Sequence, residues 1–126
     1  MRPRLPGLAA LSTAVLIAAC SGSGTTTPTG GGGGSAPCAD STGTTTVSAT
    51  VANSTWSQPV AAKVNDVITW TNSDSVPHKV ALDDGSCAMG ANIAGGSSKS
   101  LVFTKAGTYP FHCSVHPSMK GTITIS

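Results

Sequence analysis

The chain has 126 residues, of which 10% are charged and 4% aromatic, and it contains 15 glycines. This length fits one domain, at roughly 100–200 residues per domain, and the composition is typical of a small β protein with many turns. The formal charge is +2, and it comes from Arg2 and Arg4, the only arginines. In the rest of the chain five lysines balance five aspartates, so its net charge is near zero. Nucleic acid is therefore excluded as an expected partner, because phosphate binding needs clustered basic residues.

Residues 1–19 have the pattern of a secretory signal peptide, with Arg2 and Arg4 ahead of an apolar run from Leu8 to Ala19. The sequence Ile-Ala-Ala-Cys that ends at Cys20 resembles the lipobox of bacterial lipoproteins. This resemblance implies cleavage before Cys20 and a lipid on its sulfur, which would give the protein affinity for a membrane. We therefore expect a lipid-anchored protein of the cell envelope, on the periplasmic or extracellular face of a bacterial membrane. The alternative is an ordinary signal peptide with an incidental cysteine.

Residues 20–37 predict a disordered tether. They include a threonine-rich stretch at 25–29 and five consecutive glycines at 30–34. A segment without large apolar side chains cannot bury enough surface to offset its chain entropy. The expected organisation is a signal peptide at 1–19, the lipidated Cys20 with its tether to residue 37, and a folded domain at 38–126.

Short β-strands separated by turn residues make up the predicted domain, and no window shows an amphipathic helix. Alternating or β-branched patterns predict strands at 44–52, 67–71, 79–82, 100–104 and 122–125, and a further β-rich run precedes Cys113. Many short strands with frequent turns indicate an all-β fold, an antiparallel β-sandwich. Trp56 and Trp70 are expected to pack in or near its core. Residues 90–96, with three glycines, are expected to be the loosest part.

A set of metal-ligating side chains lies in the last twenty residues. Cys113, His116 and Met119 follow the spacing C-x2-H-x2-M, which places a thiolate, an imidazole and a thioether within seven residues. Thiolate and imidazole ligands with one weak thioether are typical of blue-copper electron-transfer sites, which use two histidines. The second histidine must come from upstream, and His78 is the best candidate. The predicted ligands of one copper ion are therefore His78, Cys113, His116 and Met119.

Residues 67–78 and 107–119 together closely resemble the cupredoxins. The short spacing between His116 and Met119 is similar to that of the amicyanin and pseudoazurin branch. The resemblance implies a Greek-key β-sandwich of seven to eight strands and one type I copper ion. It also implies that the His116 ring edge reaches the surface and passes electrons to redox protein partners through transient contacts. We expect the carrier to be a monomer. The apolar residues expected around that edge are Pro77, Pro117 and Met89.

The cysteines are expected to differ in role. In an oxidising compartment disulfides persist. If the lipid occupies Cys20 and copper occupies Cys113, then Cys38 and Cys87 remain to form a disulfide. The alternatives pair Cys113 with Cys38 or Cys87, which would abolish the metal site, or leave Cys38 and Cys87 reduced.

The neighbours of the ligands carry further expectations. His112 should point to the face opposite Cys113, because successive side chains of a strand alternate, so it is interpreted as a structural or surface residue. Many cupredoxins have an asparagine after the first histidine that ties the two ligand loops together, but Lys79 stands there, with Ser114 as the would-be partner. Asn72 is the candidate for a substitute bond. Met89 or a backbone oxygen is the alternative to Met119 as the axial ligand.

Three functions of different classes fit these patterns. A one-electron carrier fits best; copper storage or delivery at the envelope would use the same ligands. A metal-free adhesion domain would need only the tether and the sandwich. An enzyme is not expected, because the chain beyond residue 19 has no glutamate or arginine and four strong ligands leave copper no open position for a substrate.

Overall fold

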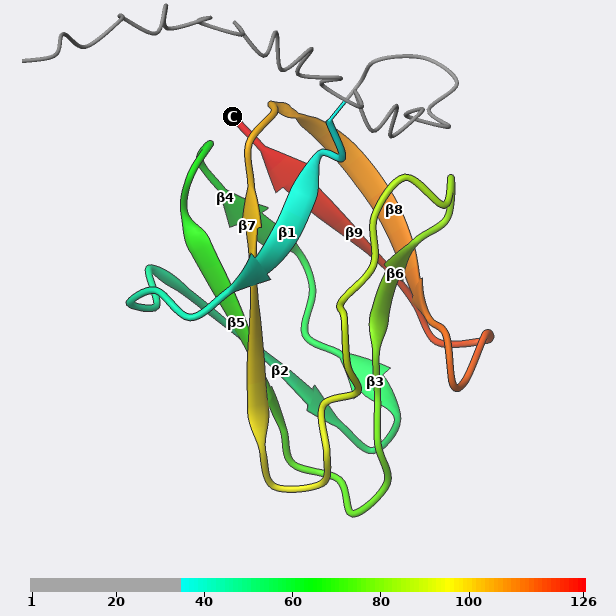
Figure 1. The fold of residues 1–126 in the computed structure, drawn as a ribbon. Coiled ribbons are helices and arrows are strands. Elements are labelled where there is room, and N and C mark those ends of the chain that lie inside the picture. Colours follow the sequence, from blue (N-terminus) through cyan, green and yellow to red (C-terminus); the bar gives the residue numbers. More distant parts are fainter. Residues whose placement is uncertain (1–34) are drawn as a thin grey trace, which may run out of the picture. The chain divides into compact units, whose positions relative to one another are not determined.

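The computed structural model describes residues 35–126, so the predicted signal peptide, Cys20 and most of the tether lie outside the described residues. The described part consists of strands in two sheets, which confirms the all-β prediction (Figure 1). No helix long and apolar enough to cross a membrane occurs between residues 35 and 126. The strands are β1 Cys38–Ser41, β2 Val47–Ala52, β3 Thr55–Trp56, β4 Val60–Ala62, β5 Val67–Asn72, β6 Val80–Leu82, β7 Ser98–Phe103, β8 Gly107–Cys113 and β9 Lys120–Ile125.

The two sheets have the orders β1-β7-β5-β2-β3 and β4-β9-β8-β6. The predicted β-sandwich is confirmed, and most strand pairs are antiparallel; two pairs are parallel, β2 with β5 and β4 with β9. After β3 the chain leaves the five-stranded sheet, contributes β4 to the other sheet and returns as β5 beside β2. The described strands also exceed the expected seven to eight, because β3 has only two residues and β4 three, too few to show a periodic pattern.

Alternation along the strands fills the space between the sheets with apolar side chains. In β8, Phe111 and Cys113 are fully buried while His112 between them is partly exposed. Phe111 packs edge-on against both tryptophans, with ring centroids 5.3 Å from Trp56 and 6.4 Å from Trp70. Both tryptophans are buried, as predicted. The buried face of β8 therefore leads directly from the aromatic core to Cys113.

The first described residues lie near the start of β8, and Cys113 is at the other end of this strand. The Lys105 ammonium, just before β8, donates to the Ser35 carbonyl at 2.9 Å, and the Thr104 N–H donates to the Pro37 carbonyl at 2.9 Å. Cys113 is the last residue of β8, at the other end of the strand. The polypeptide that precedes the domain is thus attached far from the predicted metal ligands.

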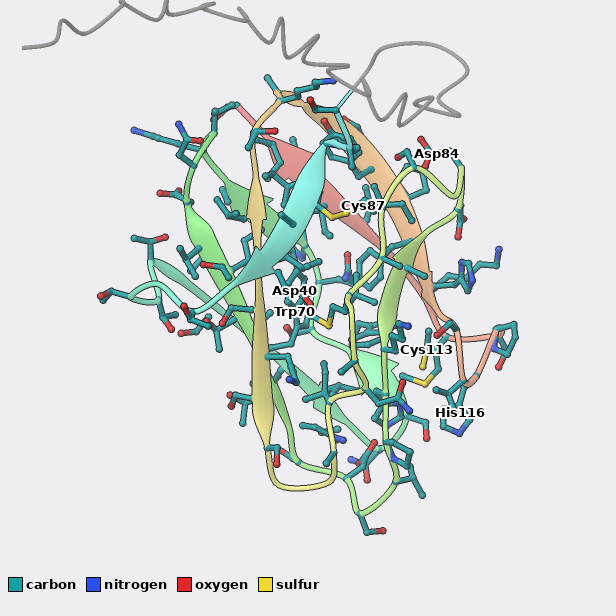
Figure 2. All side chains as sticks on the ribbon, in the orientation of Figure 1. Asp40, Trp70, Asp84, Cys87, Cys113 and His116 are labelled. Atoms are coloured by element: carbon teal, nitrogen blue, oxygen red, sulfur yellow. A yellow bond between two sulfur atoms is a disulfide. The ribbon has the colours of Figure 1, made fainter. Side chains whose placement is uncertain are left out.

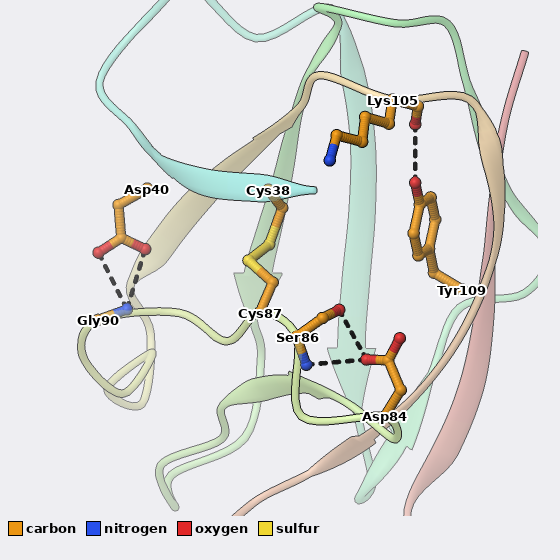
Figure 3. Close-up of a disulfide and its surroundings, with 8 residues drawn as sticks. All are labelled: Cys38, Asp40, Asp84, Ser86, Cys87, Gly90, Lys105 and Tyr109. Atoms are coloured by element: carbon orange, nitrogen blue, oxygen red, sulfur yellow. Dashed lines mark hydrogen bonds between the residues drawn. A yellow bond between two sulfur atoms is a disulfide. The ribbon is translucent and has the colours of Figure 1, made fainter. Parts of the chain in front are cut away.

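A disulfide and a carboxylate fasten β1 to the long segment between β6 and β7 (Figure 3). Cys38 and Cys87 are joined, with their Cα atoms 5.8 Å apart, and both Asp40 oxygens accept the Gly90 N–H at 2.9 and 3.0 Å. This confirms the predicted pairing and excludes both alternatives that used Cys113, which is the free cysteine of the described residues. Residues 90–96 form no regular strand, but they are not free of contacts: Gly90 bonds to Asp40, and Ile93 is fully buried and exchanges two main-chain bonds with His78.

Removing this disulfide tests its share of the stability. The double variant Cys38→Ser, Cys87→Ser should lose about 4 kcal/mol of unfolding free energy, because the crosslink closes a loop with a sequence separation of 49. Urea denaturation measures this loss as a lower midpoint, with a steeper dependence on urea because the unfolded chain without the crosslink exposes more surface. Ser86→Ala is the matched control: it removes only the hydroxyl bond to Asp84 in the same segment. A double variant as stable as this control would contradict the prediction.

Candidate metal centre

His78, Cys113 and His116 come together at one site, with their ligand atoms all within 4.8 Å of one another. Nδ1 of His78 and Nδ1 of His116 each lie 3.7 Å from the Cys113 sulfur. His78 and Cys113 are fully buried, and His116 is partly exposed. Figure 2 shows Cys113 and His116 on the loop side of the molecule, where β8 ends and its connection to β9 begins. Three of the four predicted ligands thus lie close enough together to bind one metal ion.

The loop after Cys113 closes on itself through main-chain hydrogen bonds. The Cys113 N–H donates to the Met119 carbonyl at 2.9 Å, the His116 N–H to the Cys113 carbonyl at 3.0 Å, and the Met119 N–H to the His116 carbonyl at 2.9 Å. Met119 itself is buried, at 7% exposed. The fourth predicted ligand therefore lies in the same closed loop as Cys113 and His116, and its role as the axial ligand stays a prediction.

Met89, the alternative axial group, is only 1% exposed, and its N–H donates to the Val80 carbonyl at 3.0 Å. Its burial shows that the prediction of Met89 as part of an apolar surface patch around His116 is wrong. The reason is that strand β6 pairs with the segment after Cys87, through a bridge between Ala81 and Ala88, and this turns Met89 into the core.

The Cys113 sulfur accepts a hydrogen bond from the main chain of Lys79. The Lys79 N–H lies 3.3 Å from the sulfur, and the Ser114 N–H donates to the Lys79 carbonyl at 3.0 Å. These bonds follow from the antiparallel register that places Val80 opposite Cys113. A donor aimed at sulfur favours a negative charge there. The link between the two ligand loops, which the sequence placed in doubt at Lys79, is therefore made by its backbone.

Asp74 holds the outer nitrogen of His78. One carboxylate oxygen lies 2.9 Å from Nε2 of His78, and the same carboxylate accepts the N–H groups of Ser54 at 2.8 Å and Asn53 at 2.6 Å. The Ser54 N–H is the main cause that lowers the pKa of the Asp74 carboxyl below its ordinary value, with further contributions from Asn53 and His78. An ionised carboxylate at Nε2 keeps the proton on that nitrogen and leaves Nδ1 free to bind a metal.

Asn72 organises the segment that carries Asp74 and His78. It is fully buried; its amide nitrogen donates to the carbonyls of Val76 at 2.8 Å and Ile93 at 3.0 Å, and its oxygen accepts the Asp74 N–H at 2.9 Å. The His78 main chain exchanges two further bonds with Ile93. Asn72 thus provides hydrogen bonds that support the site, as predicted. These bonds hold the segment around His78 and do not link His78 to the loop after Cys113.

Sequence reasoning missed Asp74 and Trp56 as neighbours of the ligands. The only local signal for Asp74 was its position four residues before His78. Trp56 gave no local signal, because it bonds to Met119, 63 residues further along the chain. His112 behaves as predicted: it faces away from the ligands and pairs with Asp83 at 2.6 Å.

A buried cysteine sulfur beside two imidazole nitrogens is a donor set that fits copper, because soft sulfur and imidazole both suit that metal. The structure therefore defines a β-sandwich protein with a mononuclear centre at one end. The chain belongs to the cupredoxin-like family, since residues 13–125 match the family model described as Cupredoxin-like domain.

Individual relatives agree with this membership. The chain is 37% identical over 67 residues to amicyanin of Paracoccus denitrificans, which covers 50% of this chain and 51% of that protein. It is 36% identical over 78 residues to plastocyanin of Scenedesmus fuscus, which covers 52% of this chain and 80% of that protein. The chain thus spans about half the length of this amicyanin.

Solved structures of amicyanin share the fold. The oxidized state of one amicyanin mutant is similar with a TM-score of 0.57 at 33% sequence identity, covering 64% of this chain and 81% of that chain. The reduced Cu(I) form of another amicyanin mutant gives the same TM-score at 32% identity.

Asp74→Ala tests the support of His78. Loss of the carboxylate at Nε2 should weaken copper binding about 10–100-fold, the usual effect of removing the partner of a metal-bound histidine. Competition with a chromophoric chelator measures the affinity. Asp84→Ala is the control, because Asp84 is also an ionised carboxylate with a lowered pKa, caused by its bonds from Ser86, but touches no ligand. Equal copper affinities for the two variants would refute the assigned role.

Proposed function

We propose that this protein is a type I copper electron carrier that shuttles one electron. The observation that supports this best is the convergence of the Cys113 sulfur and two imidazole Nδ1 atoms, at 3.7 Å each, in a cupredoxin-like fold. Copper bound there would supply a Cu(II)/Cu(I) couple, which thiolate and imidazole ligands stabilise in both states. Met119 is proposed as the weak axial ligand.

The hydrogen bonds around the centre can keep its geometry constant during electron transfer. Cys113 is tied to Lys79, His78 to Asp74, and the ligand loop is closed by the bond between Cys113 and Met119. Ligands fixed by separate hydrogen bonds move little when the charge of the site changes. A small rearrangement lowers the barrier to transfer, which suits a carrier.

His116 is the proposed exit for the electron. It is the one partly exposed member of the three gathered ligands, and exposed apolar residues lie beside the ligands in sequence: Val115 at 40% and Val76 at 42%, with Pro117 and Pro77. A small apolar surface suits the brief contacts of redox partners, which bury little area. We propose redox proteins as partners, met by a monomeric carrier.

Copper storage or delivery is less well supported than electron transfer. Both His78 and Cys113 are fully buried, so the ion would be shielded from exchange on two sides. With Met119 as fourth ligand, copper has no open position for a substrate, and we infer no catalytic step.

We also propose that the carrier is held at the cell envelope by lipid on Cys20. The leader sequence and the position of Cys20 support this proposal. The Lys105 bond to Ser35 lies near the start of β8, whereas Cys113 is at its other end. A tether attached near the start of β8 leaves the His116 end accessible to partners.

The thiolate is tested by Cys113→Ser. Wild-type protein with Cu(II) should show the intense blue thiolate-to-copper band and a small copper hyperfine splitting in paramagnetic resonance, and the variant should lose the band completely. The double variant Cys38→Ser, Cys87→Ser is the control and should keep it, because it removes two sulfurs outside the site. A blue band that persists in Cys113→Ser would refute the proposal.

Lys79 should raise the reduction potential, because the residue whose backbone N–H bonds the Cys113 sulfur also carries an ammonium, and a positive charge in this neighbourhood favours the Cu(I) state. Its backbone nitrogen lies 3.3 Å from the Cys113 sulfur. Lys79→Asn should therefore have a lower potential than wild type in a redox titration. Lys99→Asn, which removes an exposed lysine of β7, should change the potential less. An unchanged or higher potential in Lys79→Asn would contradict this prediction.

A further inference from the structure

Trp56 contacts both sides of the metal centre from a different sheet. It lies on the short edge strand β3, paired with Val51 of β2, and is 3% exposed. Its ring packs edge-on against His78, with centroids 5.9 Å apart and planes at 66°. Its indole N–H donates to the Met119 carbonyl at 3.2 Å. One side chain therefore touches the upstream ligand and the main chain of the predicted axial ligand.

The Met119 carbonyl accepts two hydrogen bonds, one from β8 and one from β3. The Cys113 N–H closes the ligand loop on this oxygen at 2.9 Å, and the Trp56 N–H ties the same oxygen to β3. The first bond fixes Met119 relative to Cys113. The second connects Met119 to β3, whose Trp56 also packs against His78, so the two bonds together hold the residue to both sheets.

Trp70 provides a contrast within the same core. It is fully buried and also packs on Phe111, at 6.4 Å, but its indole nitrogen has no hydrogen-bond partner among the described residues. Its aromatic contact is with Phe111 and with neither histidine. Core packing alone therefore does not require a tryptophan to bond the ligand loop, and the bond of Trp56 calls for a separate explanation.

We propose that Trp56 is a positioning residue of the metal centre, which sets how closely Met119 approaches the metal relative to His78. This inference rests on the proposed copper function and deepens it. Axial thioether contact is weak and long, and it tunes the potential of such centres. A small movement of the Met119 main chain would change this axial contact and, with it, the potential of the site.

The experiment compares Trp56→Phe with Trp70→Phe, because each loses one indole from the same core and only the first loses a hydrogen bond. In metal-free protein, amide exchange of Cys113 should be roughly two- to tenfold faster in Trp56→Phe than in Trp70→Phe, the effect of one hydrogen bond on the loop. The Ile68 amide, in the centre of the five-stranded sheet, reports global unfolding in each variant and corrects for it. With copper, the reduction potential and the ratio of the two thiolate-to-copper bands should shift in Trp56→Phe alone.

A second measurement covers the case in which Trp56→Phe does not fold. Benzothienylalanine, which carries sulfur in place of the indole N–H, is incorporated for tryptophan in the Trp70→Phe background, so that only position 56 changes. The same shifts in exchange, potential and band ratio are expected.

The outcomes separate this inference from the proposed function. Exchange, potential and band ratio that match those of Trp70→Phe would overturn the role of Trp56, even in a protein that binds copper with a blue band. Faster Cys113 exchange in Trp56→Phe, together with a wild-type protein that shows no blue band with copper, would support the positioning contact and would refute the proposed copper function.

Discussion

Leaving a buried polar group without a hydrogen-bond partner costs free energy, and this cost governs the metal centre. His78 and Cys113 are both fully buried, so the protein supplies each of them with a partner of its own. The Asp74 carboxylate hydrogen-bonds to Nε2 of His78, and the Lys79 N–H donates to the Cys113 sulfur. Because these partners are fixed by further bonds, the positions of the ligand atoms are a property of the fold, which is what a carrier with a small rearrangement barrier requires.

The rest of the sandwich connects to these bonds through a few specific contacts. The register of β6 against β8 places Lys79 at the thiolate, and the crossing between the sheets places Trp56 beside His78. On the other side, the disulfide from Cys38 fastens the segment whose residue Ile93 exchanges two main-chain bonds with His78. Stability of the domain and geometry of the centre therefore depend on the same segments, and the end of the domain that receives the chain remains distant from both histidines.

The parts that could be predicted from sequence are those encoded by local patterns. The spacing of Cys113 and His116, the strand alternation and the β class need only neighbouring residues, and His78 followed from the need for a second imidazole. The parallel strand pairs, the two-residue strand β3 and the support from Asp74 depend on contacts between distant segments. Trp56 shows the difference most clearly: its type predicted burial correctly, but its bond to the ligand loop spans 63 residues.

Copper-edge X-ray absorption of the loaded protein in both oxidation states tests most directly whether the fold dictates the geometry of the centre. We predict one short copper–sulfur distance and two copper–nitrogen distances in the Cu(II) form, and the same ligands at nearly the same distances after reduction. Loss of a nitrogen or of the short sulfur contact on reduction, or a Cu(II) form with no sulfur ligand, would contradict a centre whose geometry is held by the protein.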